Sequence, residues 1–148
     1  MNNHLKHRWP TPLVVAVALL ASPMAQADVV TDWNITATDI AVAANLPPPP
    51  TYRVMTLVQS AAYEAVNAIT KRYPADRGKL DAAPGASIEG AVAAANRAIL
   101  SKLLPAQQAA IDRAYQTALS TLPDGPAKTG GIAVGEQAAA AILTLRAD

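Results

Sequence analysis

The chain has 148 residues, 51% of them hydrophobic and 16% charged, and its formal net charge is +1 at pH 7. A chain this close to neutral, whose basic residues are spread along the sequence, lacks the positive surface that nucleic-acid binding requires. The chain has no cysteine, which excludes disulfides, thiolate catalysis and zinc–thiolate sites.

The first 27 residues have the pattern of a secretory signal peptide. Lys6 and Arg8 precede an apolar run over residues 12–21, and residues 25–27 (Ala-Gln-Ala) match a small-x-small cleavage site. The run is shorter than the roughly 20 residues that a transmembrane helix needs, so the pattern favours a cleaved signal over an uncleaved anchor. We therefore predict a secreted or periplasmic mature chain that begins near Asp28 and is soluble.

Cleavage would change both the charge and the chemistry of the chain. Removing residues 1–27 removes two basic and no acidic side chains, which leaves a net charge of about −1. His4 and His7 lie in the same segment, so residues 28–148 hold no histidine. The mature chain therefore lacks the usual general base, metal ligand and phosphate carrier.

The remaining sequence predicts five helices and no strand, because no stretch alternates apolar and polar residues. A first helix is expected near residues 29–45, and the proline run 47–50 is expected to end it as a stiff extended spacer. A second helix near residues 51–70 has the most regular apolar spacing. Lys71 and Arg72 follow it, where their charges would complement the helix dipole.

A loop near residues 73–86 is predicted to lead to a third helix, capped by Ser87 and ending near Leu103. Pro105 is expected to open a fourth helix that ends near Thr121. After a turn over residues 122–126, Asp124 is the predicted cap of the last helix. That helix has no glycine stop before residue 148, which favours an interrupted helix over a finished one.

The predicted fold class is therefore all-α, with one alanine-rich domain over residues 28–148 that forms an incomplete helical bundle. Phenylalanine is absent and alanine supplies much of the apolar content. Each buried side chain then removes little area from water, so we expect a thin core with marginal stability.

Several short stretches carry a resemblance to a known family. They are residues 28–34 (DVVTDWN), 61–69 (AAYEAVNAI), 84–87 (PGAS), 122–129 (LPDGPAKT), 135–136 (GE) and 145–148 (LRAD). Together they resemble the secreted vanadium-dependent haloperoxidase-related proteins of the type 2 phosphatidic acid phosphatase superfamily. The resemblance spans nearly all of residues 28–148.

The resemblance implies a helical N-terminal part that packs beside a C-terminal helical bundle. In the family, that bundle holds vanadate or phosphate through a lysine, arginines, a Ser-Gly-His segment and a second histidine. None of these motifs has a match in this chain, and phosphoryl transfer needs both a nucleophile and clustered cations. No catalytic, cofactor-binding or metal-binding residue is therefore carried over. The expected function is a non-catalytic N-terminal portion, from a shortened reading frame or as a stand-alone remnant.

Residue clusters offer weaker candidates, each with a simpler structural explanation. Asp28, Asp32 and Asp39 share a helix face and could bind a hard cation, but acidic residues also favour a helix N-terminus. Lys71, Arg72, Arg77 and Lys79 could bind an anion, but a solvated loop explains them better because Asp76 and Asp81 dilute the charge. The simpler explanation is preferred for both clusters.

Three further patterns each have a functional and a simpler structural explanation. Residues 125–131 superficially resemble a phosphate-binding loop but lack a glycine before Lys128, so a turn at a helix start is preferred. Tyr63, Glu64 and Asn67 could form a polar site on the second helix, although hydrogen bonds to a neighbouring helix are the preferred explanation. Residues 34–36 form a glycosylation sequon, to which we attach little weight.

Two rival functions remain open. The first is a secreted interaction module that docks a helical partner, or a second copy, through an exposed apolar stripe. The second is an enzyme that uses only carboxylates and tyrosine, as some glycosidases do. Its glutamates, Glu64, Glu89 and Glu136, fall on three different predicted helices.

Overall fold

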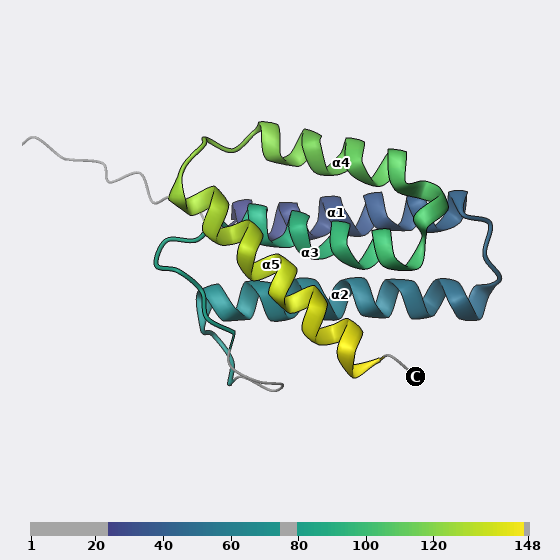
Figure 1. Cartoon of the computed structure of the whole chain (residues 1–148), viewed down its shortest axis with the longest axis horizontal. Helices are drawn as coiled ribbons and strands as arrows, with labels where there is room; N and C mark the ends of the chain where they lie inside the picture. Colours follow the sequence, from purple (N-terminus) through teal and green to yellow (C-terminus); the bar gives the residue numbers. More distant parts are fainter. Residues whose placement is uncertain (1–23, 75–79, 147–148) are drawn as a thin grey trace, which may run out of the picture.

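The computed structural model describes residues 24–74 and 80–146, with side chains described from Val29 onward. Within these ranges the chain forms five α-helices, one short 3₁₀ helix and no strand (Figure 1). They are α1 (Met24–Ala43), α2 (Pro48–Thr70), α3 (Ile88–Leu103), η1 (Pro105–Gln107), α4 (Gln108–Ser120) and α5 (Pro126–Leu145). The prediction of an all-α fold with five helices is confirmed.

The predicted signal peptide falls mostly on residues 1–23, which lie outside the described part of the chain. α1 begins at Met24 and therefore includes the predicted cleavage site. None of the described helices is long and apolar enough to cross a bilayer.

The prediction for the proline run was wrong. Pro48, Pro49 and Pro50 form the first turn of α2, and only Pro47 is extended, with φ −59° and ψ 158°. The first turn of a helix contains N–H groups that have no intrahelical acceptor, so proline is tolerated there. The Thr51 N–H then donates to the Pro47 carbonyl at 3.2 Å, which closes the first turn.

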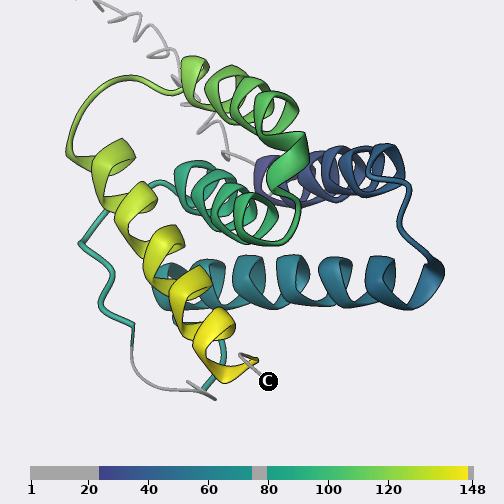
Figure 2. The same cartoon turned by 45° about the vertical axis from the view of Figure 1, so that its right-hand side comes forward.

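α3 is the central helix of the fold. Figure 2 shows it enclosed by α1, α2, α4 and α5, and ten of its 16 residues are buried. Ser87 caps this helix as predicted, because its hydroxyl oxygen accepts from the Gly90 N–H at 3.0 Å. Residues 90–95 of this helix are all buried and are glycine, alanine or valine. This part of α3 therefore presents only backbone and methyl groups to its neighbours.

α5 crosses α3 at very short range. A Cβ atom at Gly135 would overlap the Ala91 carbonyl oxygen and lie 2.9 Å from Ala94 Cβ, and a Cβ atom at Gly131 would overlap the Ser87 carbonyl oxygen. The Ser87 N–H also donates to the Ala127 carbonyl at 2.8 Å, which ties the start of α3 to the first turn of α5. The two backbones can approach this closely only because glycine has no side chain.

Two hydrophobic clusters fill the space around α3. The larger cluster joins α1, α2, α3 and α5 and also takes in the start of α4. Its largest fully buried side chains include Val58, Ile99, Leu100, Ile111 and Ile142. The smaller cluster lies where α1 and α4 meet α3, and it includes Trp33, Val92, Tyr115 and Leu119. The aromatic side chains of the core therefore lie on the α4 side, while the glycine and alanine contacts lie on the α5 side.

The predicted cap of the last helix was also wrong. Gly125 occupies the N-cap position with φ 150°, Pro126 follows at the first helical position, and no side chain caps the helix. Asp124 lies one residue too early to cap α5, and its carboxylate instead accepts from Lys128 Nζ at 2.9 Å. Glycine is suited to this position because its φ lies in a region that L side chains rarely adopt.

α4 is fixed to α3 by a polar group at its first turn. Asp112 accepts from Arg97 Nε at 2.9 Å and from Gln108 Nε2 at 2.9 Å. The Arg97 guanidinium also lies 4.9 Å from the centre of the Tyr115 ring, a cation–π arrangement. Pro105 does open this region as predicted, but its first turn is the 3₁₀ helix η1 rather than α-helix.

Gly135→Ala is expected to destabilise the protein by about 2–4 kcal/mol, because α3 and α5 must separate to admit the new methyl group. The matched control is Gly130→Ala, whose Cβ would meet only Ala83 Cβ at 3.4 Å and Ala86 Cβ at 3.5 Å. The control is expected to be neutral or stabilising by up to about 1 kcal/mol. Urea denaturation followed by circular dichroism measures both; equal midpoints would contradict the close α3–α5 contact.

The Asp112 group predicts a pH-dependent contribution to stability. The hydrogen bonds from Gln108 and then Arg97 lower the pKa of Asp112 below its ordinary value of 3.8. Its stabilising effect is therefore complete well above that value and is lost as the pH falls through the lower pKa of the folded state. Asp112→Asn should lower the urea midpoint at about pH 7 and have a smaller effect at about pH 2. Gln116→Ala, at an exposed position of α4 with no ionisable group, is the control that should change the midpoint equally at both pH values.

Candidate functional site

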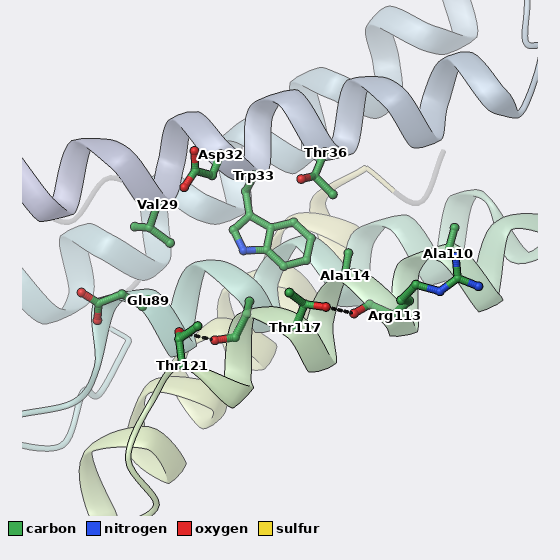
Figure 3. A pocket seen from close by; sticks show the side chains of 11 residues that line it. Val29, Asp32, Trp33, Thr36, Glu89, Ala110, Arg113, Ala114, Thr117 and Thr121 are labelled. Atoms are coloured by element: carbon green, nitrogen blue, oxygen red, sulfur yellow. Dashed lines mark hydrogen bonds between the residues drawn. The ribbon is translucent and has the colours of Figure 1, made fainter.

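A groove of about 570 Å³ lies between α1 and α4, with the start of α3 at one end (Figure 3). Its apolar surface comes from Val29, Trp33, Ala110, Ala114 and Ala118. Pockets for small organic ligands commonly have volumes of about 300–1,000 Å³ and mainly apolar walls with a few polar groups. This groove has both properties, which makes it the candidate site of the described structure.

Trp33 is the largest side chain in the groove. It projects from α1 into the space between α1 and α4, with the nitrogen edge of its indole on the side of Val29 and Glu89 (Figure 3). Trp33 is only 4% exposed, yet its indole N–H has no hydrogen-bond partner among the residues that the structure describes. A donor in this position is available to an acceptor atom that enters the groove.

Charged groups lie at opposite ends of the groove. Asp32 and Glu89 lie on the side of the indole nitrogen, and Arg113 extends from α4 at the other end (Figure 3). The Glu89 carboxylate accepts from the Ser87 hydroxyl at 2.8 Å, which restricts its position. The groove therefore has an acidic end and a basic end, separated by Trp33.

Three threonine hydroxyls complete the polar lining: Thr36 of α1, Thr117 of α4 and Thr121, the C-cap residue that follows α4. Thr117 donates to the Arg113 carbonyl at 2.9 Å and Thr121 donates to the Ala118 carbonyl at 2.8 Å. Each of these oxygens keeps acceptor capacity, because a hydroxyl has two lone pairs and one proton. Thr36 lines the opposite wall. The groove thus offers mainly acceptors at its acidic end and one unused indole donor.

The sequence analysis did not identify this groove. Trp33 entered there only as part of residues 28–34, which carry the family resemblance, and the fourth helix was given no functional role. One signal was present: Arg113 and Thr117 of α4 and Thr121, its C-cap residue, recur every four residues and so lie on one side of this segment. That spacing predicts a polar face but cannot show that the face borders a groove.

The candidate cation site on α1 is not assembled from the described side chains. Asp32 and Asp39 are both exposed on α1, and the side chain of Asp28 lies outside the described residues. In the described ranges, no group of three or more His, Cys, Asp or Glu side chains is placed to hold a metal ion. Asp32 instead lines the groove.

The basic cluster after α2 is described only in part. Lys71 and Arg72 are exposed, whereas Arg77 and Lys79 fall in residues 75–79, outside the described ranges. Lys71 is the C-cap of α2 in a left-handed conformation, with φ 51°, and its N–H donates to the Asn67 carbonyl at 2.8 Å. Both cations therefore follow the last turn of α2 rather than lying within it.

The polar group of α2 has a structural role that differs from the predicted one. Asn67 is buried, and its side chain makes two hydrogen bonds to the backbone of Tyr73, donating to the carbonyl at 3.1 Å and accepting from the N–H at 2.9 Å. It therefore fixes the following loop, not a neighbouring helix. Tyr63 is exposed, with its ring 6.2 Å from the Tyr73 ring, and Glu64 is buried.

The remaining candidates are separated in space or occupied by structural contacts. Residues 125–131 form the start of α5, where the Ala127 carbonyl accepts from Ser87. The side-chain oxygen of Asn34, in the sequon, accepts from Gln59 Nε2 at 2.8 Å. The glutamates of the rival enzyme hypothesis lie on α2, α3 and α5, and of these only Glu89 lines the groove.

Comparison of the chain with known protein families, with curated protein sequences and with solved structures found no match.

Proposed function

We propose that this chain is the non-catalytic N-terminal helical portion of a secreted vanadium-dependent haloperoxidase-like or acid-phosphatase-like protein. The proposal rests on the resemblance of residues 28–34, 61–69 and 122–129 to that family. It also rests on the lack of histidine in residues 28–148. A second helical bundle would then supply the residues that hold vanadate or phosphate, and this chain would contribute packing.

A set of exposed large apolar side chains on α1 and α2, which we call the α1–α2 surface, also supports this proposal. It is defined by Ile35, Val42, Tyr52 and Tyr63, which are 57%, 67%, 70% and 48% exposed. Residues seven or eleven apart return to the same side of a helix, so each pair shares a face. The hydrogen bond between Gln59 and Asn34 holds the two helices side by side.

The α1–α2 surface is suited to packing against another helical body. Apolar patches on a soluble protein commonly mark the contact with a partner, and tyrosine is enriched at such contacts because it combines a large apolar ring with a hydroxyl. The α1–α2 surface contributes two tyrosines and two aliphatic side chains, and the exposed Asp39 lies between Ile35 and Val42 on the same face of α1. A partner helix bundle would remove these side chains from water.

The same surface supports a second candidate function, a secreted interaction module that binds a helical partner or a second copy of itself. The coding sequence beyond residue 148 distinguishes the two. A continuous reading frame that encodes a Ser-Gly-His segment would support the first function, and a stop codon would support the second.

Activity assays test the lack of catalysis directly. The purified full chain is expected to show no oxidation of bromide by hydrogen peroxide in the presence of vanadate, and no hydrolysis of p-nitrophenyl phosphate, because phosphoryl transfer and vanadate ligation need an imidazole or equivalent nucleophile. Turnover in either assay that co-purifies with the chain would overturn the proposal.

A second experiment tests the α1–α2 surface. Because the surface is apolar, the full chain should self-associate as its concentration rises, and the double variant Ile35→Glu/Val42→Glu should weaken association at least about tenfold. Gln116→Glu/Gln137→Glu, exposed on α4 and α5, adds the same charge elsewhere and should leave association unchanged. Light scattering after size exclusion gives the mass. If the chain is a monomer at every concentration, or if Ile35→Glu/Val42→Glu leaves association unchanged, the α1–α2 surface is ruled out as a contact surface.

A further inference from the structure

We propose that the groove between α1 and α4 binds a small amphiphilic amine that also carries a neutral oxygen acceptor. The site is separate from the α1–α2 surface and goes beyond the proposed packing function. Its determinants are the unpartnered indole N–H of Trp33, the carboxylates of Asp32 and Glu89, and the apolar wall of α4 (Figure 3).

The indole donor specifies the oxygen acceptor. The indole nitrogen is not among the fully buried polar atoms of the described residues that lack a partner, so solvent reaches it within the groove, and a ligand oxygen can take the place of that water. Trp33 is more than nine-tenths buried and lines the groove, and no described residue accepts from its nitrogen. A hydroxyl or carbonyl oxygen of a ligand would accept this hydrogen bond.

The acidic end specifies the amine. Asp32 and Glu89 lie on the side toward which the indole nitrogen points (Figure 3), so an ammonium group there would be close to two carboxylates. Glu89 is already held by the Ser87 hydroxyl at 2.8 Å, and Asp32 has no partner among the described side chains. Hydrogen bonds between charged groups are stronger than neutral ones, so this end selects a cation.

The basic end of the groove limits the ligand to one positive charge. Arg113 lies at the opposite end from the two carboxylates (Figure 3). A diamine long enough to span the groove would place its second ammonium beside the Arg113 guanidinium, and like charges repel. The Trp33 ring and Ala114 lie between the two ends of the groove (Figure 3), so its middle suits an apolar body. The ligand is therefore a monoamine with an apolar body, not a polyamine.

An anionic amphiphile is the main competing ligand, because Arg113 and the indole N–H are both donors. The geometry disfavours it, since the indole nitrogen points to the acidic end and away from Arg113 (Figure 3). An anion that reached the indole donor would lie next to Asp32 and Glu89. An anionic probe, 3-phenylpropionate, therefore tests this competing ligand directly.

Fluorescence titration can test the site because the chain has two tryptophans, Trp9 and Trp33. In the full chain with Trp9→Phe, emission reports Trp33 alone. The probes are phenylalaninol, which has an amine, a hydroxyl and a phenyl ring, 3-phenylpropanol, which lacks the amine, and 3-phenylpropionate, which is an anion. Phenylalaninol is expected to shift the emission saturably and to bind at least about tenfold more tightly than the other two.

Variants locate the binding within the groove. Asp32→Asn and Glu89→Gln should each weaken phenylalaninol binding by about fivefold to tenfold, while Arg113→Gln should not weaken it. Asp39→Asn is the control, because Asp39 is on the same helix but does not line the groove. Tighter binding of phenylpropionate that Arg113→Gln abolishes would replace this proposal with an anion site. No saturable shift with any probe, in a protein whose circular dichroism shows it folded, would overturn the site altogether.

Discussion

The backbone contact between α3 and α5 is the constraint on which the rest of the structure depends. Gly131 and Gly135 of α5 lie against the carbonyls of Ser87 and Ala91, where no Cβ atom fits. The chain contains no phenylalanine, and the contact of α3 with α5 is made by backbone and small side chains rather than by large rings. Close approach compensates, because many short-range atomic contacts between backbones and methyl groups add up to a substantial attraction.

The other side of α3 is packed differently, and the groove follows from that difference. There the small cluster contains Trp33 and Tyr115, side chains much larger than alanine. A large ring between α1 and α4 holds the two helices apart, and the alanines of α4 leave the space beside the ring unfilled. The volume of the groove is therefore a consequence of one tryptophan facing a wall of small residues.

These two kinds of packing explain which features could be predicted from the sequence. The five helices and the Ser87 cap depend on local spacing and on one side-chain hydrogen bond, so they were predicted correctly. The errors at Pro48 and Asp124 both concern the first turn of a helix. The N–H groups of a first turn have no intrahelical acceptor, so proline is tolerated there in α2 and α5, and in α5 the N-cap residue is Gly125 rather than Asp124. The groove depends on the distance between α1 and α4, and no local pattern encodes that distance.

α1 contributes to both proposed functions, and its geometry allows them to operate together. Trp33 is buried toward the groove and Ile35 is exposed on the α1–α2 surface, two residues further along and so about 200° around the helix. A partner that covers Ile35 and Val42 would contact the outer side of α1, while the groove opens on the side of α4. Binding of a helical partner would therefore leave the indole donor of Trp33 accessible to a small ligand.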